Sequence, residues 1–118
     1  MKIYVTDGQV VGETVSTMFT IGPQQGQTAA LVFIKNSGVN TMNYRFQENN
    51  GSAWVDLGAQ GSDYYNTLSP AEVRSFKVTS TYPQVQMVAN ASGGAFLDFS
   101  LDRYYNRPAG GAIPILAL

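Results

Sequence analysis

The side chains that could do acid–base or metal chemistry in this sequence are a few carboxylates. Asp98 and Asp102 share one face of a predicted strand, where a rise of about 3.3 Å per residue places them about 13 Å apart. That distance is too long for a shared cation or for the carboxylate pair of a glycosidase. Asp56 and Asp63 flank a glycine-containing loop that could hold calcium, but their spacing is not that of an EF-hand, which favours solvated loop carboxylates.

Histidine and cysteine are both absent from the 118 residues. Their absence excludes Ser–His and Cys–His nucleophiles, thiolate zinc sites and disulfides. The glycine pairs at 93–94 and 110–111 lack the spacing of a phosphate-binding loop. We therefore expect a protein that is not an enzyme and that has no catalytic residue, no metal site and no cofactor.

The small number of charged residues limits the kinds of partner that this protein can bind. Only 13% of the residues are charged, whereas an average soluble domain has about 25% charged residues. The net charge is −1. No basic field is available to hold nucleic acid. No apolar run approaches the length of about 18 residues that a membrane span needs, and no signal peptide is visible. A neutral polar surface with aromatic residues suits contact with other proteins or with sugars.

Aromatic residues are the candidates for sugar binding, with Trp54, Tyr64 and Tyr65 as the alternative glycan site. Adjacent residues of a strand point to opposite faces, so at most one tyrosine of each neighbouring pair can join a given platform. The competing interpretation places Trp54 and Phe46 in the core and the tyrosines at the rim of a sheet or at an interface.

The end of the sequence contains the candidate protein-interface residues. A cluster of cations and aromatics is followed by proline, glycine and an apolar tip, a composition typical of an extended arm. The apolar tip is expected either to pack on its own domain or to dock on a neighbour, and the prolines, which keep the arm extended, favour the neighbour. The candidate contact residues are Arg103, Tyr104, Tyr105, Arg107, Ile113, Ile115, Leu116 and Leu118.

These side chains must be positioned by strands, because helical periodicity is absent. Residues 27–35 alternate with apolar residues on both faces, which predicts a central strand covered on both sides. In residues 40–48, Met42, Tyr44 and Phe46 are predicted to face inward. The sequence Asn49-Asn50-Gly51 predicts a type I′ hairpin, followed by a return strand over 53–57.

Further strands are predicted on both sides of this hairpin. A short strand over 2–5 is expected to break at Asp7-Gly8, and a second strand lies within 14–21. A turn at 69–72 precedes a strand over 73–79, and 84–89 and 95–102 complete the set. The pattern predicts a single antiparallel β-sandwich of about eight strands, jelly-roll or immunoglobulin-like, over 1–103, with an extended arm over 104–118.

The run from 29 to 103 resembles the small β-sandwich virion proteins of tailed bacteriophages, of the capsid decoration or cement type. The segments that carry the resemblance are Leu31-Val32-Phe33-Ile34-Lys35-Asn36, Tyr44-Arg45-Phe46-Gln47, Asn50-Gly51-Ser52-Ala53-Trp54-Val55-Asp56-Leu57, Leu68-Ser69-Pro70 and Val85-Gln86-Met87-Val88-Ala89-Asn90. The same rhythm, with a Gly-x-x-Trp hairpin, occurs in carbohydrate-binding sandwiches.

The resemblance implies a homo-oligomer, often a trimer, that stabilises the phage head by multivalent docking. Its partners would be copies of itself and the major capsid protein or another virion protein, without nucleic acid or membrane. Its place would be the capsid surface, after synthesis in the host cytoplasm. A carbohydrate-binding module and a phage tail or baseplate component are the alternatives.

Overall fold

The computed structural model describes residues 2–21, 27–79 and 84–105, with side chains over 7–21, 30–79 and 84–101. Those residues form strands and no helix, as predicted. The strands are β1 (Lys2–Val11), β2 (Ser16–Ile21), β3 (Gln27–Asn36), β4 (Met42–Asn49), β5 (Trp54–Asp56), β6 (Tyr65–Leu68), β7 (Val73–Thr79), β8 (Val85–Asn90) and β9 (Ala95–Tyr105). Only β6 was not predicted, since its residues belong to a polar stretch of the sequence.

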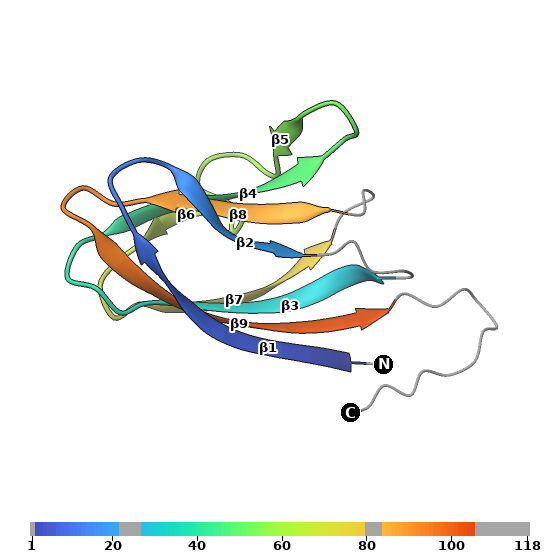
Figure 1. The fold of residues 1–118 in the computed structure, drawn as a ribbon, viewed down its shortest axis with the longest axis horizontal. Helices are drawn as coiled ribbons and strands as arrows, with labels where there is room; N and C mark the ends of the chain where they lie inside the picture. The colour runs from blue at the N-terminus through green and yellow to red at the C-terminus, as the bar shows by residue number, and fades with distance from the viewer. Residues whose placement is uncertain (1, 22–26, 80–83, 106–118) are drawn as a thin grey trace.

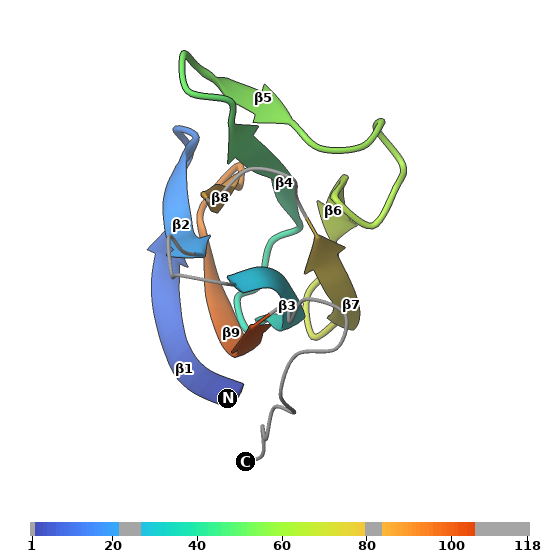
Figure 2. The same cartoon turned by 90° about the vertical axis from the view of Figure 1, so that its right-hand side faces the viewer.

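The strands form two antiparallel sheets packed face to face (Figure 1). Sheet A has the order β1-β9-β3-β7, and sheet B has the order β2-β8-β4-β5. The edge of β4 that faces away from β8 pairs with two strands. β6 pairs with the first half of β4, and β5 pairs with its second half. Seen along the strands, the two layers enclose one core, and β5 lies beyond β4 at the outer end of sheet B (Figure 2).

The strand order identifies the sandwich as a jelly roll. In an immunoglobulin domain the first two strands share a sheet. Here β1 and β2 lie in opposite sheets, and the chain changes sheet again from β2 to β3, from β3 to β4, and at each step from β6 to β9. With β1-β9-β3-β7 facing β2-β8-β4-β6, the result is the double-sheet arrangement of a jelly roll. Of the two sandwich types expected from the sequence, the structure has this one.

The core lies between the inner faces of the two sheets. Met42, Tyr44 and Phe46 of β4 are at most 2% exposed, so the predicted inward face of this strand is confirmed. The Phe46 ring makes edge contacts with Phe19 and Phe76, with centroids 5.9 and 5.4 Å apart. Edge-to-face pairs of this kind add about 0.5–1.5 kcal/mol each to the burial of their area.

The predicted break at Asp7-Gly8 is wrong, because β1 continues to Val11 and pairs with β9 throughout. A Cβ at Gly8 would lie 2.8 Å from Cζ of Phe96, so the Phe96 ring of the neighbouring strand covers this glycine. Glycine here allows a cross-strand aromatic ring to approach the backbone, and it does not end the strand.

The predicted type I′ turn is also wrong, although the hairpin itself forms. Gly51 has a positive φ of 98°, but Asn50 does not, and a type I′ turn needs both. The Asn50 side chain instead accepts hydrogen bonds from the backbone N–H groups of Ser52 and Ala53, and the Asn49 side chain accepts one from Gly51. These side-chain bonds stabilise a longer loop than the two-residue turn.

β3 is central in sheet A, as predicted, but it is covered on one face only. Ala30, Val32 and Ile34 are at most 1% exposed, whereas Phe33 is 36% exposed on the outer face. No element of the described part of the chain covers that outer face. The expectation of burial on both sides was wrong. An apolar strand face indicates that it is covered, but the cover can be another molecule as well as the same chain.

Candidate functional site

The outer face of sheet A is the first candidate for an interaction surface. It has one exposed apolar side chain from each of its four strands, and we call this set the apolar face: Val10 (72% exposed), Phe33 (36%), Val73 (61%) and Phe96 (37%). Val10 and Phe96 are direct cross-strand partners. An apolar surface shared by neighbouring strands is typical of a contact with another macromolecule.

A shallow hollow of about 260 Å³ opens on the same face. Phe33 and Val73 contribute apolar surface to it, and Lys35 and Asp98 lie opposite each other in the β3–β9 register. The Asp98 carboxylate also accepts a hydrogen bond from the Ser37 hydroxyl. The charges of this face are thus few and of both signs, which lets a neutral apolar surface approach it.

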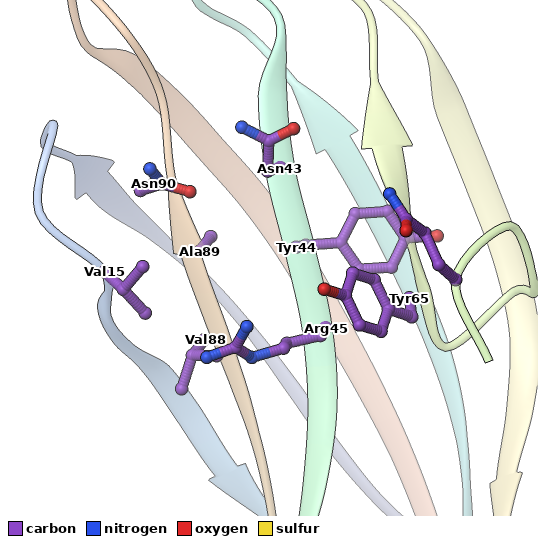
Figure 3. Close-up of a pocket in the computed structure, with 9 residues that line it drawn as sticks. Val15, Asn43, Tyr44, Arg45, Tyr65, Val88, Ala89 and Asn90 are labelled. Atoms are coloured by element: carbon purple, nitrogen blue, oxygen red, sulfur yellow. The ribbon is translucent and has the colours of Figure 1, made fainter. Parts of the chain in front are cut away.

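The outer face of sheet B has a different character. A pocket of about 200 Å³ lies over β4 and β8, and we call it the sheet B pocket (Figure 3). Polar and apolar groups line it in similar measure. The lining residues are Val15, Asn43, Tyr44, Arg45, Gln60, Tyr65, Val88, Ala89 and Asn90.

Arg45 is the central residue of the sheet B pocket. Its side chain extends from β4 toward Val88 on β8 (Figure 3), and its guanidinium carbon lies 5.9 Å from the centre of the Tyr65 ring. Its Nε lies 3.3 Å from Oδ1 of Asp56, which is an ion-pair distance, yet makes no hydrogen bond. Within the described residues, the guanidinium therefore has a neutralising partner but retains its hydrogen-bonding capacity.

The three aromatic residues of the predicted glycan platform lie in different settings. Tyr65 lines the sheet B pocket. The Tyr64 ring faces inward, 5.8 Å from that of Phe76, and its hydroxyl donates to the Lys77 carbonyl oxygen. The two adjacent tyrosines thus point to opposite sides, as expected. Trp54 is not a core residue, because it is 36% exposed on β5, whereas Phe46 is fully buried.

The candidate contact residues near the end of the chain are only partly described. The backbone of Arg103, Tyr104 and Tyr105 belongs to β9, where Arg103 pairs with Ile3 and Tyr104 with Lys2. Their side chains lie outside the described side chains. The remaining residues of this set lie outside the described residues altogether: Arg107, Ile113, Ile115, Leu116 and Leu118.

A network of polar side chains connects the loop at Asp63 to β4, β7 and the turn before β7. The Tyr44 hydroxyl donates to the Asp63 carbonyl oxygen and accepts a 2.7 Å hydrogen bond from Arg74. Arg74 also pairs with Glu72 at 2.6 Å. Burial raises the pKa of Tyr44, and the Ser69 backbone N–H followed by Arg74 lowers the pKa of Glu72. The groups satisfy one another, so this network is structural.

Among the described side chains, no three residues of the metal-ligating types come together. The described residues also contain no helix that is long and apolar enough to cross a membrane. What the described surface offers is therefore the apolar face on one sheet and the sheet B pocket on the other.

Comparison with known proteins identifies the fold. A chain from Bacillus endospore appendages, which form a family of disulfide-linked pili, superposes with a TM-score of 0.59 at 12% identity, covering 91% of this chain and 88% of that one. PirA superposes with a TM-score of 0.56 at 15% identity, covering 86% and 93%. The sequence matches no family model and no curated protein. At these identities the shared property is the β-sandwich fold.

Proposed function

We propose that this chain is a structural subunit that assembles with copies of itself, without catalysis, and that its place is the surface of a phage head, where it acts as a decoration or cement protein. The observation that carries the proposal is the apolar face of sheet A. Val10 and Val73 are more than half exposed there, beside Phe33 and Phe96. Covering these side chains removes apolar area from water, which stabilises association.

The occupant we propose for the apolar face is a second copy of this chain, through its residues 107–118. That segment contains Ile113, Ile115, Leu116 and Leu118 and no acidic residue. It follows β9, one of the two central strands of sheet A, and thirteen residues from Asn106 onward can span up to about 43 Å when extended. This length is sufficient to reach a neighbouring subunit.

The pilus-forming neighbour supports self-assembly as a use of this fold, but its chemistry differs in one respect. Those pili are disulfide-linked, whereas this chain has no cysteine. Any assembly of this chain therefore forms without disulfides, and it depends on the buried area and on the number of linked contacts. The virion location is supported by the sequence resemblance, and a tail or baseplate position would use the same surface.

The first experiment is the solution mass of the purified chain by light scattering, with and without residues 107–118. We expect the full chain to form a homo-oligomer, a trimer under the virion proposal, and the chain ending at Asn106 to be monomeric and folded. A full-length monomer, or an unchanged oligomer after truncation, would contradict arm-mediated assembly.

A paired substitution tests the receiving surface separately. The double variant Val10→Gln, Val73→Gln makes the apolar face more polar at two exposed positions and should raise the concentration for half-assembly at least about tenfold, while leaving the fold intact. Val55→Gln is the matched control, since Val55 is 44% exposed on β5, which belongs to the opposite sheet. Equal weakening by both variants would exclude the apolar face as the docking surface.

A further inference from the structure

The sheet B pocket contains hydrogen-bonding groups that the described protein does not use. Asn43 and Gln60 line it, and neither side chain makes a hydrogen bond within the described residues. Asn90 uses its amide nitrogen on the Glu13 carbonyl oxygen at 3.3 Å, which leaves its amide oxygen available. Amide groups can each donate and accept, so this set matches a ligand that does both.

The floor and one wall of the pocket are apolar. Val88 is 6% exposed beneath the opening, and Val15 is 46% exposed at its edge. The Tyr65 ring contributes a half-buried aromatic surface from β6, held next to Arg45 by their cross-strand pairing. Unused polar groups around an apolar floor and an aromatic ring suit a ligand with an apolar face and hydroxyl groups at its edge.

The electrostatics of the pocket favour a ligand without net charge. Arg45 is the one cation among the lining residues, and the Asp56 carboxylate lies 3.3 Å from its Nε. The volume of about 200 Å³ lies below the range of roughly 300–1,000 Å³ typical of drug-sized ligands. A single ring with several hydroxyl groups meets the limits on size, charge and polarity together.

We propose that the sheet B pocket binds the ring of a neutral saccharide, with Arg45, Asn43 and Gln60 contacting its hydroxyl groups and Tyr65 and Val88 contacting its apolar face. This site lies on the opposite sheet from the apolar face and does not require assembly. A small open pocket leaves much of the ligand in water, so the dissociation constant of a single ring should be on the order of millimolar.

The test is an NMR titration of the isotope-labelled full chain with glucose, galactose, mannose and N-acetylglucosamine, with N-acetylneuraminic acid as the anionic comparison. We expect at least one neutral sugar to produce saturable shifts at the amides of Asn43, Arg45 and Tyr65. Absence of saturable shifts with every neutral sugar, shifts confined to other surfaces, or tighter binding of N-acetylneuraminic acid would each overturn the proposal.

Matched variants connect the shifts to the pocket. Arg45→Gln should weaken binding at least about tenfold, whereas Lys35→Gln, which removes the same charge from the outer face of sheet A, should not change it. Tyr65→Ala should abolish saturable binding, and Tyr65→Phe, which keeps the ring, should retain it. Retained binding in both Arg45→Gln and Tyr65→Ala, with the fold confirmed by the amide spectrum, would place the sugar elsewhere.

Discussion

Asn36 is the one fully buried polar residue of the described core, and every polar group of it has a partner. Its amide nitrogen donates to the carbonyl oxygens of Asn40 and Leu68 at 2.8 and 2.9 Å, and its amide oxygen accepts from the Gly38 N–H. The backbone of Asn36 bonds to Glu72 and Ala71. This residue therefore links β3, the loop before β4, the end of β6 and the turn before β7.

Replacing Asn36 with alanine should lower the free energy of unfolding by about 2–4 kcal/mol. The reason is that the carbonyl groups of Asn40 and Leu68 and the N–H of Gly38 would lose their partners where water has little access. Urea unfolding measures the change. Asn43→Ala is the control, because Asn43 is exposed and makes no such bonds, and it should change stability by less than about 0.5 kcal/mol. If both variants lost a similar amount of unfolding free energy, the hydrogen bonds of the Asn36 side chain would have no special role in stability.

Glu72 gives the protein an acid-sensitive contact. The Ser69 N–H and Arg74 hold the pKa of its carboxyl below the ordinary value of 4.5. A carboxyl with a lowered folded-state pKa contributes stability that is fully present above its unfolded-state pKa and is lost as the pH falls through the folded-state pKa. Stability should therefore decline from about pH 4.5 downward.

The substitution Glu72→Gln should reduce that decline, because glutamine has no proton to take up. Urea midpoints measured from neutral pH to pH 3 give the comparison. Asp63→Asn removes the same charge from a neighbouring loop carboxyl that has no hydrogen bond within the described residues, and its profile should follow the parent. A Glu72→Gln profile as steep as that of the parent would assign the acid sensitivity to other groups.

At the scale of the elements, the β4–β5 hairpin depends on its loop. Gly51 has a φ of 98° and the Asn49 and Asn50 side chains bond to the backbone around it. An added Cβ at Gly51 would meet no atom within 4 Å, so only the backbone conformation opposes a larger residue. The hairpin presents Trp54 and Asp56, and Asp56 in turn neutralises Arg45 in the sheet B pocket.

Gly51→Ala should therefore destabilise the protein by about 1–2 kcal/mol, as L-residues disfavour positive φ. Gly12→Ala is the matched comparison, since an added Cβ there also meets nothing within 4 Å and Gly12 has no positive φ. That variant should be neutral or more stable by about 0.4–1 kcal/mol, because alanine reduces the freedom of the unfolded chain. Thermal unfolding of the two variants measures both changes. Equal changes in stability would contradict a role for the positive φ of Gly51.

For the whole molecule, the two outer faces divide the proposed functions between them. Sheet A has an apolar face for other copies of the chain, and sheet B has a polar pocket for a neutral sugar ring. The net charge of −1 leaves little long-range field around either surface. Association should therefore depend on buried apolar area and not on charge.

An assembly held in this way should keep its mass when the salt concentration rises. Charge-driven contacts weaken as the screening length falls from about 10 Å at 0.1 M to about 3 Å at 1 M salt. Light scattering at these two concentrations should give the same oligomer mass for the full chain. Dissociation at high salt would assign the contact to the charged residues of the cluster near Arg103 and Arg107 instead of the apolar tip.

Much of the fold follows from local patterns in the sequence. The alternation around Met42, Tyr44 and Phe46 predicted the buried face of β4, and the adjacent positions of Tyr64 and Tyr65 predicted their opposite directions. The absence of histidine and cysteine excluded whole classes of chemistry. These features are local because the side chains of a strand alternate with a period of two residues.

The tertiary structure decided what depends on pairing between distant segments. Period-two alternation says which side of a strand is apolar, but not which strand lies beside it, so the β1–β9 pair and the jelly-roll order could not be read locally. The sheet B pocket likewise needs Val15, Arg45, Gln60 and Val88 from four separate segments. The exposure of Phe33 could not be predicted for the same reason. An apolar strand face has the same sequence pattern whether its own chain or another molecule covers it.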